Sequence, residues 1–159
     1  MTIEDVERDF VDRLVEAVPG AVAADPPPVV PACLVLLYSP GQFAVLPSAL
    51  AFPMSEGFEG IVRLLADVDF HESQMMEDSA PELFELACYL DQTRLPDERA
   101  QALLNEASRR LNGLDWRSRL AVADDFLVFA TDMEQCHLEE NLRVVTTDER
   151  ATRILDALR

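Results

Sequence analysis

The side chains that could do chemistry together fall into two acidic groups. The first lies around His71 and comprises Asp67, Asp69, Glu72, Glu77 and Asp78. The second surrounds an apolar run and comprises Asp124, Asp125, Asp132, Glu134, Glu139 and Glu140. Carboxylate oxygens bind hard divalent cations, and an imidazole adds a nitrogen ligand. One hypothesis is therefore a metal- or small-molecule-binding enzyme with an acidic site near Asp124, Asp125 and His71.

The spacing of these groups follows no standard metal or nucleophile pattern. The segment around His71 does not meet the EF-hand arrangement of alternate ligands with a central glycine, and no C-x-x-C or H-x-x-x-H pair offers zinc ligands. Asp124 and Asp132 flank a strand of about eight residues, so roughly 25 Å separates them. Cys136 and His137 are adjacent in sequence, so their side chains diverge on a helix. We therefore predict no catalytic residues, no metal ligands and no cofactor.

Charge is the dominant property of the composition. The chain carries 30 acidic and 13 basic residues, the basic ones all arginine, for a formal net charge of −17. Nucleic acid and anionic membranes repel such a surface, so neither is an expected partner. No apolar run approaches the ~20 residues that span a bilayer. Two explanations of the charge stay open: adaptation for solubility, high salt or a GC-rich genome, or attraction of a basic protein partner.

The most lopsided part of the chain lies between Arg63 and Arg94, where eight acidic residues occur with no basic one. Residues 67–79 have no regular period and are predicted to form an exposed loop. Apolar side chains inside an acidic rim are typical of the centre of a protein interface. We predict a partner-binding surface made of Asp69, Phe70, Glu72, Met75, Glu77 and Asp78. The alternative is that the apolar members fold back onto the helices.

Length and cysteine content indicate one domain in a reducing compartment. A chain of 159 residues can bury a core without metal or disulfide staples, so residues 1–159 are predicted to form a single globular domain. The cysteines Cys33, Cys88 and Cys136 are odd in number and far apart. With no secretory signal in the sequence, we expect reduced thiols and a cytoplasmic location.

In the N-terminal half, Thr2 and Asp5 form an approximate capping box for a helix that Pro19-Gly20 is expected to stop near residue 18. A Pro-rich connector follows at about 21–31. Residues 32–38 and 42–46 then read as a hairpin around a Ser-Pro-Gly turn. Two prolines bracket residues 48–52, which confines that piece to a sheet edge or a loop. The next helix is expected to be capped by Ser55.

In the C-terminal half, residues 125–132 hold an apolar run without polar alternation, typical of a strand covered on both faces. We predict that it is the central strand. Helices beginning near Ser79 and Pro96 should form an antiparallel pair, and Trp116 should be a packing anchor. A short helix over 133–142, a brief strand over 143–146 and a helix capped by Thr147 complete the chain. The predicted fold class is α+β, a small antiparallel or mixed sheet packed by about five or six helices.

Three segments of the C-terminal half resemble the C-terminal part of an uncharacterised bacterial domain family. They are 111–116 (LNGLDW), 122–134 (VADDFLVFATDME) and 138–142 (LEENL), within the span 111–143, which is about a fifth of the chain. The family has no established activity, and Ala123 stands where its pattern has threonine. In size and charge the protein is also similar to immunity proteins of bacterial toxin systems.

The expected function is thus that of a non-enzymatic bacterial interaction protein, an immunity-type protein that neutralises a basic toxin. A homodimer is a further possibility for this chain, because an exposed hairpin edge near Ala44 offers unpaired backbone groups to a second copy.

Overall fold

The computed structural model describes residues 2–39 and 45–159. Its four strands form one mixed sheet in the order β3-β2-β1-β4. They are β1 (Cys33–Tyr38), β2 (Ala49–Pro53), β3 (Phe70–Ser73) and β4 (Leu127–Asp132). β2 runs antiparallel to both β1 and β3, whereas β1 and β4 are parallel, with Cys33 opposite Leu127 and Tyr38 opposite Asp132. A parallel pair needs a crossover connection, and the described residues between β1 and β4 supply it with two further strands and three α-helices.

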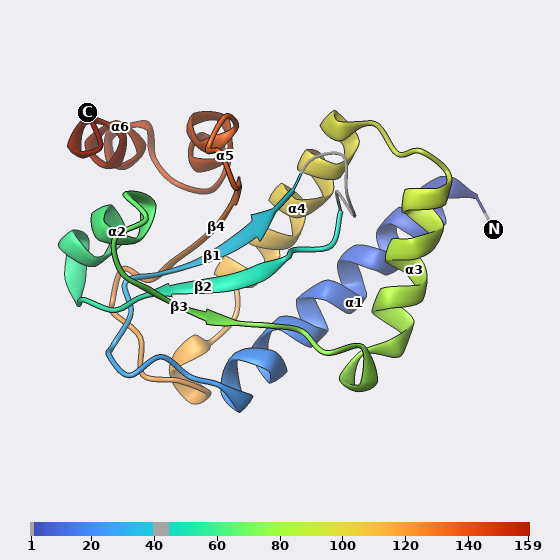
Figure 1. Cartoon of the computed structure of the whole chain (residues 1–159), viewed down its shortest axis with the longest axis horizontal. Coiled ribbons are helices and arrows are strands. Elements are labelled where there is room, and N and C mark those ends of the chain that lie inside the picture. The colour runs from blue at the N-terminus through green and yellow to red at the C-terminus, as the bar shows by residue number, and fades with distance from the viewer. Residues whose placement is uncertain (1, 40–44) are drawn as a thin grey trace.

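Helices cover both faces of this sheet, so the molecule has three layers (Figure 1). The helices are α1 (Ile3–Ala24), α2 (Gly57–Leu65), α3 (Pro81–Gln92), α4 (Asp97–Asn112), α5 (Leu138–Val145) and α6 (Asp148–Ala157). Two single 3-10 turns, η1 (Glu77–Ser79) and η2 (Trp116–Ser118), lie between them. The structure thus confirms an α+β fold with a small mixed sheet and, in its described residues, six α-helices.

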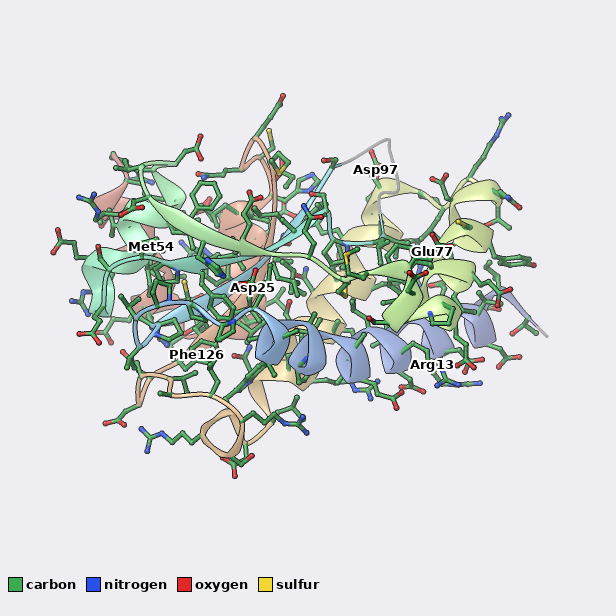
Figure 2. The ribbon with its side chains drawn as sticks, turned by 60° about the horizontal axis from the view of Figure 1, so that its bottom comes forward. Arg13, Asp25, Met54, Glu77, Asp97 and Phe126 are labelled. Atoms are coloured by element: carbon green, nitrogen blue, oxygen red, sulfur yellow. The ribbon has the colours of Figure 1, made fainter. Side chains whose placement is uncertain are left out.

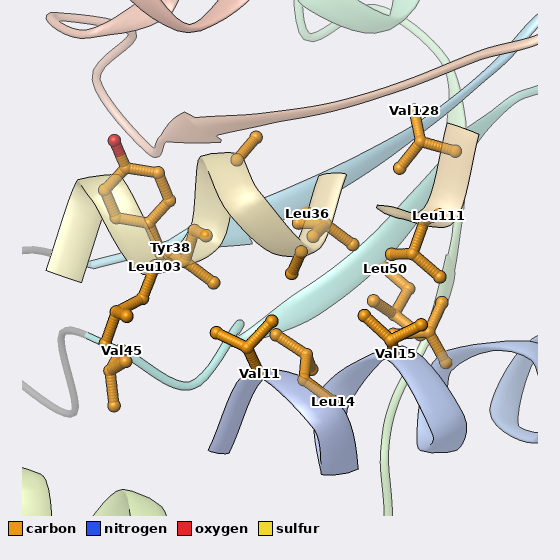
Figure 3. Packing of buried hydrophobic residues seen from close by; sticks show 14 of the residues in the cluster. Val11, Leu14, Val15, Leu36, Tyr38, Val45, Leu50, Leu103, Leu111 and Val128 are labelled. Atoms are coloured by element: carbon orange, nitrogen blue, oxygen red, sulfur yellow. The ribbon is translucent and has the colours of Figure 1, made fainter. Parts of the chain in front are cut away.

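The two faces of the sheet bury two separate apolar clusters. Alternate β1 residues point to opposite sides, as strand geometry requires: Leu34 and Leu36 join α1, α3 and α4, whereas Cys33 and Val35 join α2, α5 and α6. Figure 3 shows the first cluster, in which Leu14 of α1 and its neighbours lie against the sheet. Because both faces are covered, the two interior strands β1 and β2 are apolar at every position and show no polar alternation.

The strand over 125–132 is buried as predicted but is not central. All six residues of β4 are buried, yet β4 lies at one edge of the sheet. The two interior strands are β1 and β2, and the flanking prolines had indicated that the segment now seen as β2 would be an edge or a loop. Pro53 is the last residue of β2, where its missing N–H interrupts little pairing. The predicted second hairpin strand, 42–46, lies partly outside the described residues, as does the dimer edge near Ala44.

Three expectations about helix ends are wrong, namely the stop near residue 18 and the caps at Ser55 and Ser79, and the capping box at Thr2 is confirmed. Thr2 and Asp5 form the predicted capping box. α1 nevertheless continues through Pro19 to Ala24, since its last turns bury Val18 and Val22 in the core; that burial offsets the backbone hydrogen bond that proline removes. The Pro-rich connector therefore begins only at residue 25. Ser55 and Ser79 cap nothing, because the residues at the helix N-caps are Glu56 and Ala80.

The predicted loop over 67–79 contains β3 and η1. Tertiary pairing with β2 orders a segment whose own sequence carries no clear period, which is how context overrides local propensity. The predicted pairing of α3 with α4 is wrong, because each of these two helices packs against α1.

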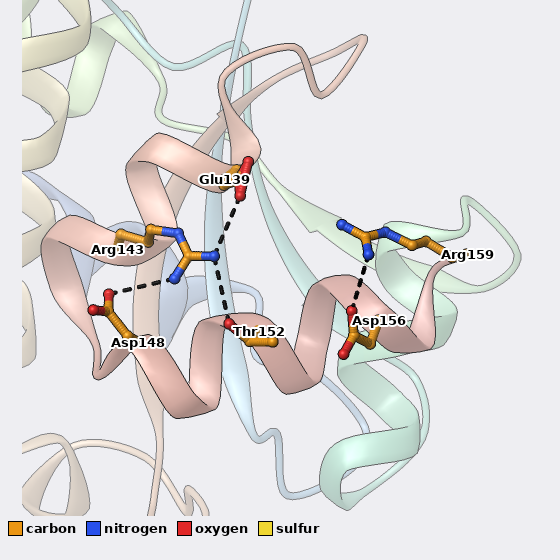
Figure 4. Close-up of polar contacts among 6 residues, drawn as sticks. All are labelled: Glu139, Arg143, Asp148, Thr152, Asp156 and Arg159. Atoms are coloured by element: carbon orange, nitrogen blue, oxygen red, sulfur yellow. Dashed lines mark hydrogen bonds and ion pairs between the residues drawn. The ribbon is translucent and has the colours of Figure 1, made fainter.

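Residues 143–145, expected in a strand, belong to α5, and the Thr147 hydroxyl caps α6 as predicted. Arg143 joins these two helices (Figure 4). Its guanidinium contacts the Glu139 carboxylate at 3.2 Å, the Asp148 carboxylate at 3.3 Å and the Thr152 hydroxyl at 3.4 Å. These charge-assisted contacts connect α6 to α5. The contact with Glu139 depends on Arg143 lying in α5, because residues four apart are neighbours on one face of a helix.

Candidate functional site

The structure does not assemble the predicted acidic site. His71 lies on β3 and Asp124 and Asp125 precede β4, at opposite edges of the sheet. Three strand spacings of about 4.8 Å separate these edges by roughly 14 Å. The Asp124 side chain is 94% exposed and paired with Arg117, and Asp125 is paired with Arg150. Among the residues that the structure describes, no group of three or more potential ligands is placed to hold a metal ion.

His71 has a structural partner instead. Its Nε2 lies 3.1 Å from the backbone oxygen of Asp25 and 3.2 Å from the carboxylate of the same residue. The Ser73 hydroxyl donates to the same backbone oxygen at 2.7 Å. Two side chains of β3 thus fasten the end of α1 to the edge of the sheet, where the last carbonyl groups of a helix need donors.

The predicted partner-binding residues are divided between two faces of the molecule. Phe70 packs on the cluster beneath α2, α5 and α6, and Met75 on the cluster beneath α1, α3 and α4. Asp69 is half-buried beside Phe70, whereas Glu72, Glu77 and Asp78 are exposed. Both apolar side chains therefore fold back onto the core, the alternative that the sequence had left open, and only part of the predicted set shares a surface.

A groove opens beside the C-terminal half of α1. Its floor is a stripe of small side chains, and its opposite wall comes from the segment that joins β3 to α3. The floor residues are Ala17, Gly20, Ala21 and Ala24, and the wall residues include Glu72, Gln74, Met75 and Met76. Its volume is about 760 Å³, which is within the range of ligand-binding clefts. Figure 2 shows Arg13 and Asp25 along α1, with Glu77 on the facing segment.

The groove continues along the N-terminal half of α1, where α3 forms the opposite wall. This second stretch has a volume of about 590 Å³. Its lining includes Val6, Asp9, Asp12, Glu85, Leu86 and Tyr89. Arg13, Glu16 and Glu82 line both stretches, so the two stretches adjoin where Arg13 pairs with Glu82. We call the two together the α1 groove.

Acidic side chains line the α1 groove along its length. They are Asp9, Asp12, Glu16, Asp25, Glu72, Glu82 and Glu85. Arg13 is the one basic residue in the described lining. In the part of the chain that the structure describes, no ion pair involves Asp9, Glu72 or Glu85. The groove therefore combines an apolar floor with a surplus of negative charge.

A second polar constellation lies at the carboxyl ends of β1 and β4, the usual place for ligands in sheets with parallel strands. The Tyr38 hydroxyl is 2.8 Å from Nδ1 of His137 and accepts a hydrogen bond from the Asn141 amide at 3.1 Å. Burial raises the pKa of Tyr38 to about 12. The Asp132 carboxylate accepts from the backbone N–H groups of Cys136 and His137 at 2.9 and 2.8 Å.

This constellation holds the fold together and lacks an activated nucleophile. Nδ1 of His137 is engaged by Tyr38, and among the described residues no hydrogen bond joins the His137 ring to the Cys136 thiol. The nearby Asp132 raises the pKa of the exposed Cys136 thiol, which keeps the sulfur protonated. The Asn141 amide uses both ends, since its oxygen accepts from Gln101 at 2.8 Å and its nitrogen donates to the Ala130 carbonyl at 2.9 Å. Sequence reasoning missed these buried polar contacts.

The segments that resemble the bacterial family meet around β4. The Asn112 side chain forms hydrogen bonds with both the N–H and the carbonyl of Val128. Two residues further along β4, the Asn141 side chain donates a hydrogen bond to the Ala130 carbonyl. Two amide side chains thus occupy the outer edge of β4, where another strand would otherwise pair. Trp116 is the predicted packing anchor: it is 5% exposed, and its ring meets Phe126 edge to face at 5.4 Å.

The shared residues of those segments therefore account for structure around β4, and the family relation itself stays a prediction. Within the described residues, no helix combines the length and the apolar character that crossing a bilayer requires. Comparisons of the chain with protein-family models, with curated proteins and with solved structures found no match.

Proposed function

We propose that this protein is a non-enzymatic interaction protein that binds a basic protein partner in the α1 groove. The observation that carries the proposal is that an apolar floor and an acidic rim occur together in two adjoining cavities along α1. Apolar contact supplies most of the affinity of such interfaces, and charge complementarity supplies encounter rate and discrimination.

The chemistry of the groove defines the partner. Seven carboxylates against one guanidinium favour a surface rich in lysine or arginine, and the net charge of −17 steers such a surface toward the protein. The exposed Met76 offers a flexible side chain that can pack against varied apolar groups. In the form that the similarity to immunity proteins implies, the partner is a basic toxin that this protein neutralises.

The acidic enzyme hypothesis has no comparable support. Its candidate residues, His71 with Asp124 and Asp125, lie at opposite sheet edges and are engaged with other partners.

A direct test uses two synthetic peptides and calorimetry. One peptide alternates leucine and arginine so that a helix has one apolar and one cationic face, and its control replaces each arginine with glutamate. We expect binding of the cationic peptide alone. Raising the salt from about 0.01 to about 0.15 M shortens the Debye length from roughly 30 to about 8 Å and should weaken the complex. Equal binding of both peptides, or affinity indifferent to salt, would contradict the proposal.

Two matched pairs of variants test whether the cationic peptide binds in the α1 groove. Glu16→Gln with Glu82→Gln removes two rim charges that both stretches of the groove share and should weaken the cationic peptide. Glu149→Gln with Asp156→Asn removes two charges from α6, on the opposite side of the sheet, and should leave it unchanged. If the two pairs weaken binding equally, the attraction comes from net charge and not from the groove.

A further inference from the structure

The α1 groove also indicates which shape of partner it takes, an inference that rests on the proposed function. We infer that the occupant is a single cationic amphipathic helix lying along α1 on the small-residue stripe, and that one of its cations replaces Arg13 at Glu16 and Glu82. The reasons lie in the floor, the length and the one basic residue of the groove.

The floor offers unused room. Ala17, Gly20, Ala21 and Ala24 follow each other at the spacings that place residues on one helix face. A β-carbon added to Gly20 would meet nothing within 4 Å. Glycine inside a helix is less favourable than alanine, and no close contact among the described residues requires a glycine at this position. Small residues let a second helix approach closely, since the distance between helix axes depends on the side chains at the contact.

The form of the groove favours a helix over an extended segment. From Val6 to Ala24 the groove follows α1 over 18 residue steps, about 27 Å at the helical rise of 1.5 Å. A partner helix of similar length fills it, with an apolar stripe on the floor and cations toward both rims. An extended segment relies on main-chain hydrogen bonds, and the backbone of α1 has already used its own within the helix.

Arg13 occupies the place of a partner cation. Its guanidinium lies 2.8 Å from Glu82 on α3 and 3.5 Å from Glu16 on its own helix, where the two stretches of the groove meet. The side chains of Arg13 and Glu82 are 48% and 61% exposed, and an ion pair exposed to this extent contributes little to stability. A lysine or arginine of the incoming helix can therefore displace Arg13 at little expense.

The test measures affinity and peptide helicity with the full chain and the same cationic peptide. Gly20→Leu fills the floor, and because leucine favours helix more than glycine does, the fold is retained; we expect affinity to fall about tenfold or more. Arg13→Gln removes the internal competitor and should raise affinity roughly threefold, the size of an exposed ion pair. Arg8→Gln is the matched control: Arg8 lies on the same helix, pairs with Asp5 and does not line the groove, so affinity should not change.

Circular dichroism of the complex should show the peptide becoming helical. Wild-type affinity in Gly20→Leu, or a bound peptide that stays extended, would overturn the inference. If the Glu16 and Glu82 variants still weaken binding in that case, the proposed function survives with a different mode of contact. If Arg13→Gln and Arg8→Gln raised the peptide affinity equally, the cause would be net charge, and the replacement of Arg13 by a partner cation would be refuted.

Discussion

Asn112 is the residue whose replacement tests this fold most sharply. It is the last residue of α4, and its side-chain nitrogen donates to the Val128 carbonyl at 2.8 Å while its oxygen accepts from the Val128 N–H at 2.7 Å. Val128 is fully buried. Asn112→Ala leaves both of these backbone groups without a partner. Each unsatisfied buried group costs about 1–3 kcal/mol, so we expect the loss of both hydrogen bonds to lower the free energy of unfolding by about 2–6 kcal/mol.

Asn112→Asp separates hydrogen bonding from shape. Aspartate has nearly the same shape, but its carboxylate has no donor and sets an anionic oxygen against the Val128 carbonyl. We expect a loss at least as large as that of Asn112→Ala, measured by urea unfolding at neutral pH with circular dichroism. Gln92→Glu is the control, because it makes the same chemical change at the exposed last residue of α3 and should stay within about 0.5 kcal/mol of wild type. An equally small effect of Asn112→Asp would refute the assignment of Asn112 to the β4 edge.

Two further predictions follow from buried contacts. Burial raises the pKa of Tyr38 to about 12, above the value of about 10 in an unfolded chain; the stabilisation is complete below about pH 10 and is lost as the pH rises toward 12. Tyr38→Phe should therefore flatten the alkaline fall in unfolding free energy, and parallel curves for the two proteins would contradict this. Gly60→Ala should destabilise α2, because the new β-carbon would lie 1.9 Å from the backbone oxygen of Ser55. Gly20→Ala should instead stabilise α1 by about 0.5–1 kcal/mol. If thermal unfolding showed the melting temperatures of both variants shifting in the same direction, helix propensity alone would account for both changes.

Features governed by neighbouring residues could be predicted from the sequence. Thr2 and Thr147 cap the helices that follow them, because a hydroxyl bonds to N–H groups two or three residues away. The apolar run over 125–132 predicted a strand covered on both faces, and β4 is buried throughout. The α+β class followed from the same local patterns. Such contacts span a few residues, so the sequence holds all the information that they need.

Where long-range contacts decided the outcome, the local patterns were misleading. Pro19 predicted a helix end, yet α1 continues because Val22 lies in the core. Phe70 and Met75 are five residues apart and pack on opposite sides of the sheet, which divided the predicted partner surface. The pattern of apolar and polar residues over 70–73 gave no indication that β3 would pair with β2.

The sequence by itself therefore determined the acidic character, the helix starts that side chains cap and the buried strand over 127–132. Only the tertiary structure decided the strand order, the sealing of β4 by Asn112 and Asn141, and the groove beside α1. The physical reason is that each of these joins segments far apart in the chain. Their pairing is selected by the burial of both sheet faces at once, a property of the whole molecule that no short window of sequence contains.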